Sequence, residues 1–226
     1  MNAPSRGVLL AAVGGYLDTL GFMMLSGLFV NHVTGNIVVA VAHPGLESLP
    51  EIAMFPIFFA MVVFGTAVAG RGGLRAALTA EAAFLGLFLI LGLALVPEPG
   101  AAGRAAEIVV GAAGVAAMAI QTAVTRLAGH PYPTNMVTGT MTVLGMDTAA
   151  LLFGSGEDRT TVRRRARHLA HVVAGFAAGA TLAALVTSRA GFWAAALPLA
   201  VLAALARHDH ESPTRTIPLV QAKPSL

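Results

Sequence analysis

The sequence predicts an all-α membrane protein with six transmembrane helices, arranged as two inverted repeats of three spans each. Composition is the first reason, because 56% of the residues are hydrophobic and only 11% are charged, whereas soluble proteins average about 25% charged residues. A soluble chain of 226 residues could not bury that much apolar surface. The second reason is that six apolar runs approach the length of about 20 residues that crosses a bilayer.

The six candidate spans follow one another along the chain, with longer segments between the first and second and between the fourth and fifth. They cover residues 8–29, 52–70, 76–96, 105–128, 169–187 and 190–206. We assign residues 1–207 to a single transmembrane domain, with repeat one at about 8–96 and repeat two at about 105–206. Residues 208–226 carry three prolines and are predicted to form a disordered cytoplasmic tail.

Single residues within the runs predict how each span behaves. Asp18 interrupts the first run, but apolar residues continue beyond it and keep that segment long enough to cross. Pro56 and Pro198 predict kinks in the second and sixth spans. Gly175 and Gly179 in the fifth span form a small-xxx-small pattern that is typical of close helix packing, either within the chain or between the subunits of a homo-oligomer.

Positive charge is distributed unevenly about these spans. If the chain is threaded six times with its amino terminus in the cytoplasm, Arg104 and Arg189 are the only external residues among the 14 Lys and Arg. Cytoplasmic loops carry the excess of Lys and Arg in membrane proteins. Both termini are therefore predicted to be cytoplasmic. Nucleic-acid binding is not predicted, because no basic patch is interleaved with aromatic residues.

A short motif occurs once in each half of the chain. Residues 31–39 (NHVTGNIVV) and 135–143 (NMVTGTMTV) share Asn, Val, Thr, Gly and the final Val at matching positions. Each copy follows one span and precedes two more, so each half contains three spans. An odd number of spans makes the two halves enter the membrane from opposite sides, which is an inverted repeat.

The two Thr-Gly elements are the sharpest functional signal. Glycine permits a backbone that leaves the helix, and Thr or Asn side chains can satisfy the freed amides. A half-helix that begins at either element would direct its amides toward the midplane, where a polar or anionic solute could bind. The alternative is an ordinary helix start, with the Thr as the N-cap. The candidate substrate ligands on these elements are Asn31, Thr34, Gly35, Asn36, Asn135, Thr138, Gly139 and Thr140.

Two further candidate ligands lie within predicted spans. A lone carboxylate such as Asp18 costs about 2.5 to 3.5 kcal/mol at the centre of a membrane helix, so it requires a partner, a proton or water. Asp18 either has a structural role, in which it caps a broken helix or hydrogen-bonds to a neighbouring helix, or serves as a substrate or proton site. Gln121 aligns with Asp18 across the repeat if one gap is allowed, and either binds substrate or joins helices.

Several segments resemble the YoaK family of bacterial inner-membrane proteins. They are GGYLDTLGF at 14–22, HVTGN at 32–36, MAIQT at 118–122 and VTGT at 137–140, and the resemblance covers nearly the whole chain. It implies a multi-pass protein of the bacterial inner (plasma) membrane whose biochemical role is uncharacterised. The family often has Asn after the Gln, where Thr122 stands in this sequence.

The remaining residues argue against catalysis and metal binding. The chain has no cysteine, which excludes disulfides, thiolate metal sites and cysteine nucleophiles. His168 and His171 could share a helix face, but no third metal ligand accompanies them. We therefore predict no catalytic residue, no metal and no cofactor.

The function predicted from the sequence is transport. Polar residues on broken helices in inverted repeats are typical of secondary transporters and channels, so we expect a carrier for a small polar or anionic solute, proton-coupled through Asp18. The alternatives are an intramembrane enzyme that acts on lipid or peptide, and a non-catalytic membrane scaffold. The expected partners are the lipid bilayer and a small solute of unknown identity.

Overall fold

The computed structural model describes residues 3–101, 103–127, 136–154 and 156–208, and the regular structure in this part of the chain is helical. Long helices are expected from long apolar runs, because a bilayer offers the backbone no other hydrogen-bond partners. The helices are α1 (Ala3–Met24), α2 (Val33–Ala42), η1 (Leu46–Ser48), α3 (Leu49–Leu95), α4 (Arg104–Leu127), α5 (Val137–Phe153), α6 (Arg159–Ala190), η2 (Gly191–Ala195) and α7 (Ala196–His208).

Four helical stretches in the described residues are long and apolar enough to cross a membrane. They are Ser5–Met24, Leu46–Leu95, Arg104–Thr125 and Arg159–Arg207. The second and fourth contain 50 and 49 residues, or roughly 75 Å of helix each, against a hydrocarbon thickness of about 30 Å. Each of these two stretches therefore has the length of two crossings.

Glycine residues with positive φ bend both long stretches. Gly73 divides α3 into two arms, with φ 69° and ψ −170°, and Gly191 has φ 52° where α6 passes through η2 into α7. Only glycine adopts such angles without strain. The bend in α3 lies between the predicted spans 52–70 and 76–96, where the sequence predicted a loop.

The first span differs in its position from the prediction. The sequence placed it at residues 8–29, whereas α1 runs from Ala3 to Met24. Ser26 and Gly27 follow with φ of 50° and 95°, and this left-handed backbone ends the helix. The chain then reverses, and residues 28–32 return along the end of α1 before α2 begins.

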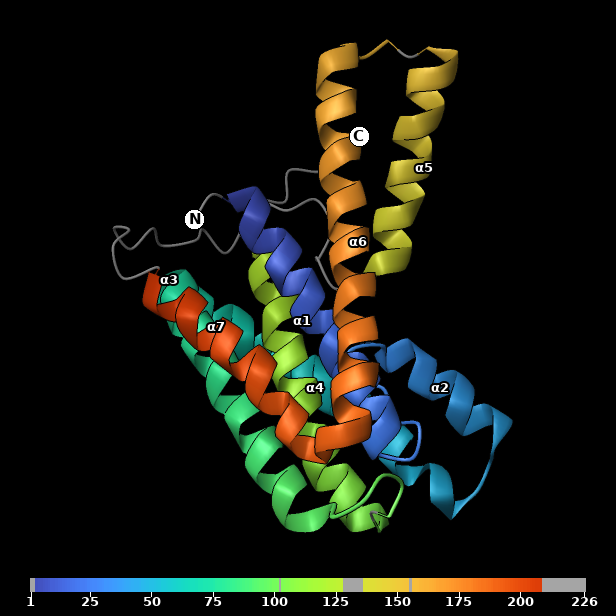
Figure 1. Ribbon diagram of the computed structural model, residues 1–226, viewed down its shortest axis with the longest axis vertical. Helices are drawn as coiled ribbons and strands as arrows, with labels where there is room; N and C mark the ends of the chain where they lie inside the picture. Colours follow the sequence, from blue (N-terminus) through green and yellow to red (C-terminus); the bar gives the residue numbers. More distant parts are fainter. Residues whose placement is uncertain (1–2, 102, 128–135, 155, 209–226) are drawn as a thin grey trace.

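Two pairings of long helices form the body of the molecule. Both arms of α3 pack against α4, and α1 packs along α6 (Figure 1). The glycines in α6 allow the second pairing, because a Cβ at Gly175 would lie 2.8 Å from the carbonyl oxygen of Val8, and one at Gly179 would clash with the carbonyl oxygen of Ala12. The small-residue face of α6 therefore packs against α1 within the chain.

The two shorter helices lie at the periphery. Helix α2 packs on α3, whereas α5 packs on the first half of α6 and projects together with it from the body (Figure 1). Asp147 joins α5 to α6, because its buried carboxylate accepts a hydrogen bond of 2.8 Å from Nε of Arg165. Arg165 also contacts Glu157 at 2.9 Å, so one guanidinium binds both α5 and the loop that joins α5 to α6.

Candidate functional site

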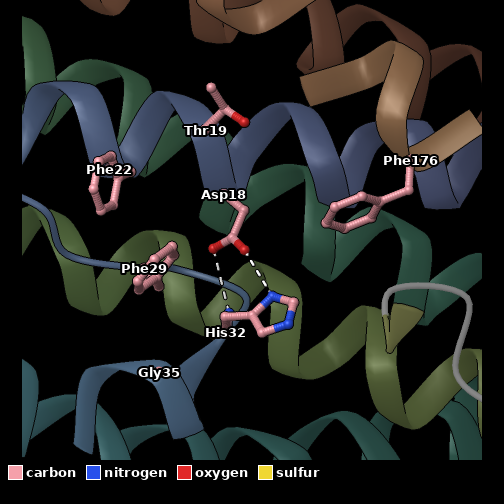
Figure 2. A pocket seen from close by; sticks show the side chains of 7 residues that line it. All are labelled: Asp18, Thr19, Phe22, Phe29, His32, Gly35 and Phe176. Atoms are coloured by element: carbon pink, nitrogen blue, oxygen red, sulfur yellow. Dashed lines mark hydrogen bonds and ion pairs between the residues drawn. The ribbon is translucent and has the colours of Figure 1, made fainter. Parts of the chain in front are cut away.

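Asp18 is the centre of a polar cluster at the end of α1. The residue is 5% exposed, and its Oδ1 accepts hydrogen bonds from the backbone amides of Asn31 at 3.0 Å and His32 at 3.3 Å. Nδ1 of His32 lies 2.9 Å from Oδ2. Figure 2 shows both contacts of His32 with the carboxylate. The reversal after α1 creates this cluster, because it brings residues 31 and 32 back beside Asp18.

A buried asparagine holds the returning segment in place. The Asn36 side chain is fully buried in the first turn of α2. Its Oδ1 accepts a hydrogen bond of 2.9 Å from the backbone amide of Phe29, and its Nδ2 donates one of 2.8 Å to the carbonyl of the same residue. Asn36 thus satisfies both backbone groups of a residue outside any helix, which is the role that the sequence predicted for the side chains of this motif.

The carboxylate borders a cavity of about 420 Å³. Its lining combines one acid, one imidazole and one hydroxyl with three aromatic rings, and consists of Asp18, Thr19, Phe22, Phe29, His32, Gly35 and Phe176. Phe22 and Phe29 lie on one side of the Asp18–His32 pair and Phe176 of α6 on the other (Figure 2). The ring centroids of Phe22 and Phe29 are 5.0 Å apart, and those of His32 and Phe176 are 6.4 Å apart.

The contact with Asp18 stabilises the protonated form of His32. The hydrogen bond with Asp18 raises the pKa of His32 above its usual value, although partial burial opposes this shift. The His32 side chain is 39% exposed, so the protonated imidazole is only partly removed from solvent. The carboxylate lies at the amino end of α2, where negative charge is favourable. Asp18 therefore occupies the place that the sequence had suggested for an anionic solute.

The cluster offers few ligands for a metal or cofactor. Catalytic zinc sites usually take three protein ligands, and the cavity lining supplies two groups of that kind, Asp18 and His32. What the lining can do chemically is bind a small molecule: the carboxylate and imidazole exchange a proton and accept hydrogen bonds, and the rings cover apolar surface.

The two Thr-Gly elements begin two helices in the same register. Val33 is the first residue of α2 and Val137 the first of α5, so the Thr and Gly of each motif follow as the second and third residues. The N-cap positions are His32 and Met136, so the alternative in which Thr34 or Thr138 is the N-cap is wrong. Thr140 instead donates to the carbonyl of Met136 at 3.1 Å.

The structure brings only part of the predicted site together. Asn31, Gly35 and Asn36 gather around Asp18 or support its loop, and Thr34 lies on the same turn of α2. Thr138, Gly139 and Thr140 lie on α5, which packs on a different helix from α2. Nε2 of Gln121 donates to the carbonyl of Leu10 at 2.9 Å, roughly 12 Å along α1 from Asp18. Asn135 lies outside the described residues.

Sequence reasoning missed two kinds of residue. His32 and the three phenylalanines become site residues only because the chain reverses after α1 and α6 packs alongside it. Glu81 carried a signal that was not used: it is the only charged residue in the predicted span 76–96. It is completely buried in the second arm of α3.

Comparison with known proteins identifies a family without a known activity. A family model described as "Protein of unknown function (DUF1275)" matches residues 6–207. No curated protein and no solved structure matches the chain. The match covers nearly all of the domain predicted at 1–207, and it confirms the prediction of an uncharacterised family.

Proposed function

We propose a transport function for this chain, which belongs to the DUF1275 family of proteins of unknown function. The chain is a secondary transporter or channel for a small polar solute, and the cavity beside Asp18 is its binding site. One observation carries this proposal: a buried carboxylate, held by two backbone amides and an imidazole, borders a cavity in a mainly apolar helical body. Ionisable groups inside membrane proteins are costly and mark solute or proton pathways.

The size and lining of the cavity indicate the class of solute. A volume of about 420 Å³ falls within the range of about 300 to 1,000 Å³ that is typical of small-molecule sites. Because Asp18 already occupies the amino end of α2, the site favours a solute that offers hydrogen-bond donors or a positive charge over an anion. The rings of Phe22, Phe29 and Phe176 would cover its apolar part, and rings also attract cations.

Asp18 and His32 give the site a means of coupling to protons. Protonated His32 and ionised Asp18 form a neutral pair at 2.9 Å. A solute that donates to Asp18 competes with His32 for this carboxylate, so its binding favours loss of the imidazole proton. Its departure restores the pair. One proton leaves as one solute enters, which is the exchange that a proton-coupled antiporter requires.

We place six spans in the inner membrane as two inverted three-span repeats, with both termini cytoplasmic. The packing supports this arrangement, because α1 on α6 in one pairing corresponds to α4 on α3 in the other, and α2 on α3 corresponds to α5 on α6. The start of α1, the bend of α3 and the ends of α4 and α7 lie toward the upper side of Figure 1. The start of α4 and the end of α6 lie at the lower side, and these carry Arg104 and Arg189.

Electrical recording on reconstituted vesicles tests the proposal. Purified protein is placed in liposomes on a solid-supported membrane, and choline, glycine, glycerol and acetate are applied in turn, each with and without a pH gradient. We expect glycine, which has no net charge, to evoke a current as each molecule exchanges for one proton. Choline should instead change the internal pH, because one cation exchanged for one proton moves no net charge, and acetate should do neither. Asp18→Asn should abolish the current, whereas Asp158→Asn, at an exposed helix cap far from the cavity in sequence, should leave it unchanged.

Two results would contradict the proposal. If none of the four solutes evokes a current or a pH change above that of empty liposomes, the chain does not carry the class of solute that the cavity predicts. If Asp18→Asn and the wild type give equal currents, the cavity is not the transport site.

A further inference from the structure

Glu81 is a buried acid that the cavity does not use. It lies in the second arm of α3, its residue is 0% exposed, and neither carboxyl oxygen has a hydrogen-bond partner among the described residues. An ionised carboxylate in such surroundings would pay a desolvation penalty that no neighbour offsets. A neutral carboxylic acid avoids most of this penalty, so the burial of Glu81 indicates that it carries a proton in this conformation.

The register between α3 and α4 places Glu81 opposite Gln121. Toward the end of α3, Phe88 meets the early part of α4, because a Cβ built at Gly114 would lie 3.1 Å from the ring of Phe88. Nearer the bend of α3, Ala77 packs in one buried cluster with Ile120 and Val124 of α4. The chain directions are opposite, because higher numbers in α3 meet lower numbers in α4. Seven residues make about two helical turns. Glu81 therefore lies on the same face of α3 as Phe88, and Gln121 on the same face of α4 as Gly114, so the two face each other two turns from the Phe88–Gly114 contact.

Gln121 has an unused acceptor at this level. The whole residue is buried, and its Nε2 donates to the carbonyl oxygen of Leu10 on α1. Its Oε1 is buried without a partner among the described residues. A neutral carboxylic acid has one O–H donor, and an amide oxygen accepts. The O–H group of a protonated Glu81 therefore lacks an acceptor, and Oε1 of Gln121 lacks a donor.

We propose that Glu81 is a second proton-binding site, at which the protonated carboxyl donates a hydrogen bond to Oε1 of Gln121. The resulting chain runs from Glu81 to Gln121 to the carbonyl of Leu10 and links α3, α4 and α1. Loss of the proton reverses the interaction, because a carboxylate repels an amide oxygen and attracts an amide N–H. Gln121 then turns its Nε2 toward Glu81 and releases Leu10, which frees α1 from α4.

This switch adds a step to the proposed transport cycle, and its role in coupling rests on that proposed function. Helix α1 carries Asp18 beyond Leu10, so the protonation of Glu81 controls how firmly the helix with the solute site is held. The proton moves from the Glu81 carboxyl to water when the conformation opens, and returns when it closes. Binding of the proton itself requires no solute.

Infrared spectroscopy on the purified full chain tests the proton directly. Glutamate labelled with ¹³C at the side-chain carboxyl shifts the C=O band of any protonated Glu and so identifies it. We expect the wild type to show this band at neutral pH, Glu81→Gln to lose it, and Glu98→Gln, at an exposed loop position, to keep it. Gln121→Leu removes the acceptor and should move the band to higher frequency.

Each alternative result overturns part of the inference. Identical carboxylic bands in the wild type and Glu81→Gln would mean that Glu81 is ionised. An unshifted band in Gln121→Leu would exclude Gln121 as the acceptor. A large loss of thermal stability in Glu81→Gln would also contradict the proposal, because a neutral isostere should replace a neutral acid without loss.

These measurements separate the two proposals. The infrared band depends only on the protonation of Glu81 and is unaffected if the vesicles show no solute current. If solute currents are found, Glu81→Gln should still bind choline or glycine, but the current should depend less steeply on the pH gradient, because only the proton site at Asp18 and His32 remains. An unchanged pH dependence would leave the transport site at Asp18 intact and refute the coupling role of Glu81.

Discussion

Replacement of Asn36 by alanine should destabilise the loop that holds Asp18, without any change in the residues that line the cavity. The Asn36 side chain is fully buried and makes two hydrogen bonds, of 2.9 Å and 2.8 Å, to the amide and carbonyl of Phe29. Alanine leaves both backbone groups without this partner. A buried polar group that loses its hydrogen bond costs about 1 to 3 kcal/mol, so the two groups together predict a loss of about 2 to 6 kcal/mol.

The assay is chemical unfolding of the purified protein in detergent, followed by tryptophan fluorescence from Trp193. Thr142→Ala serves as the matched control, since this exposed threonine also donates one hydrogen bond to a backbone carbonyl on its own helix. We expect the control to change the free energy of unfolding by less than about 0.5 kcal/mol. If Asn36→Ala is as stable as Thr142→Ala, then Asn36 does not hold the reversal that positions His32 beside Asp18, and the account of the site is wrong.

Two further predictions concern charge and packing. Because the Asp18 hydrogen bond raises the pKa of His32, the stabilisation from this pair is fully present below the pKa of an unfolded histidine and is lost as the pH rises through the raised value. In a series of melting temperatures, the stability advantage of the wild type over His32→Ala should therefore be largest near pH 6 and should shrink at about neutral pH and above. The control His43→Ala, at an exposed position, should show no such trend. An advantage of the wild type over His32→Ala that is independent of pH would refute the pairing. Gly179→Ala places a methyl group against the carbonyl of Ala12, whereas Gly86 has open space around its Cβ position. Gly179→Ala should therefore lower the melting temperature by several degrees, and Gly86→Ala should not. Equal melting temperatures of the two variants would show that α1 and α6 do not pack this closely.

The secondary structure was largely accessible to sequence reasoning because its causes are local. Apolar runs predicted helices at the right places, and the glycine at position 73 supplied the bend between two runs that were expected to be separate spans. The limits of the first helix were less accessible. Residues 25–29 are as apolar as the helix before them, and only the backbone conformation at Ser26 and Gly27 shows where the helix ends.

The candidate site was accessible only in part. Asp18 and the first Thr-Gly element could be singled out, because a carboxylate in an apolar run and a broken helix each require compensation. Their direct contact could not be predicted, since it depends on the reversal that Asn36 holds. The sequence also aligned Gln121 with Asp18 across the repeat, as either a substrate ligand or a link between helices, and its side chain donates to the carbonyl of Leu10 on α1.

The sequence alone determined that this chain is built of apolar helices and that two related motifs begin a short helix in each half, because hydrophobicity and glycine content act over a few residues. Only the tertiary structure decided which groups face one another. The partners of Asp18 come from a reversed loop, Phe176 comes from a helix late in the chain, and Glu81 meets the level of Gln121 through the packing of α3 on α4. These contacts depend on how helices far apart in the sequence pack against one another, and the spacing of residues along the chain does not predict that packing.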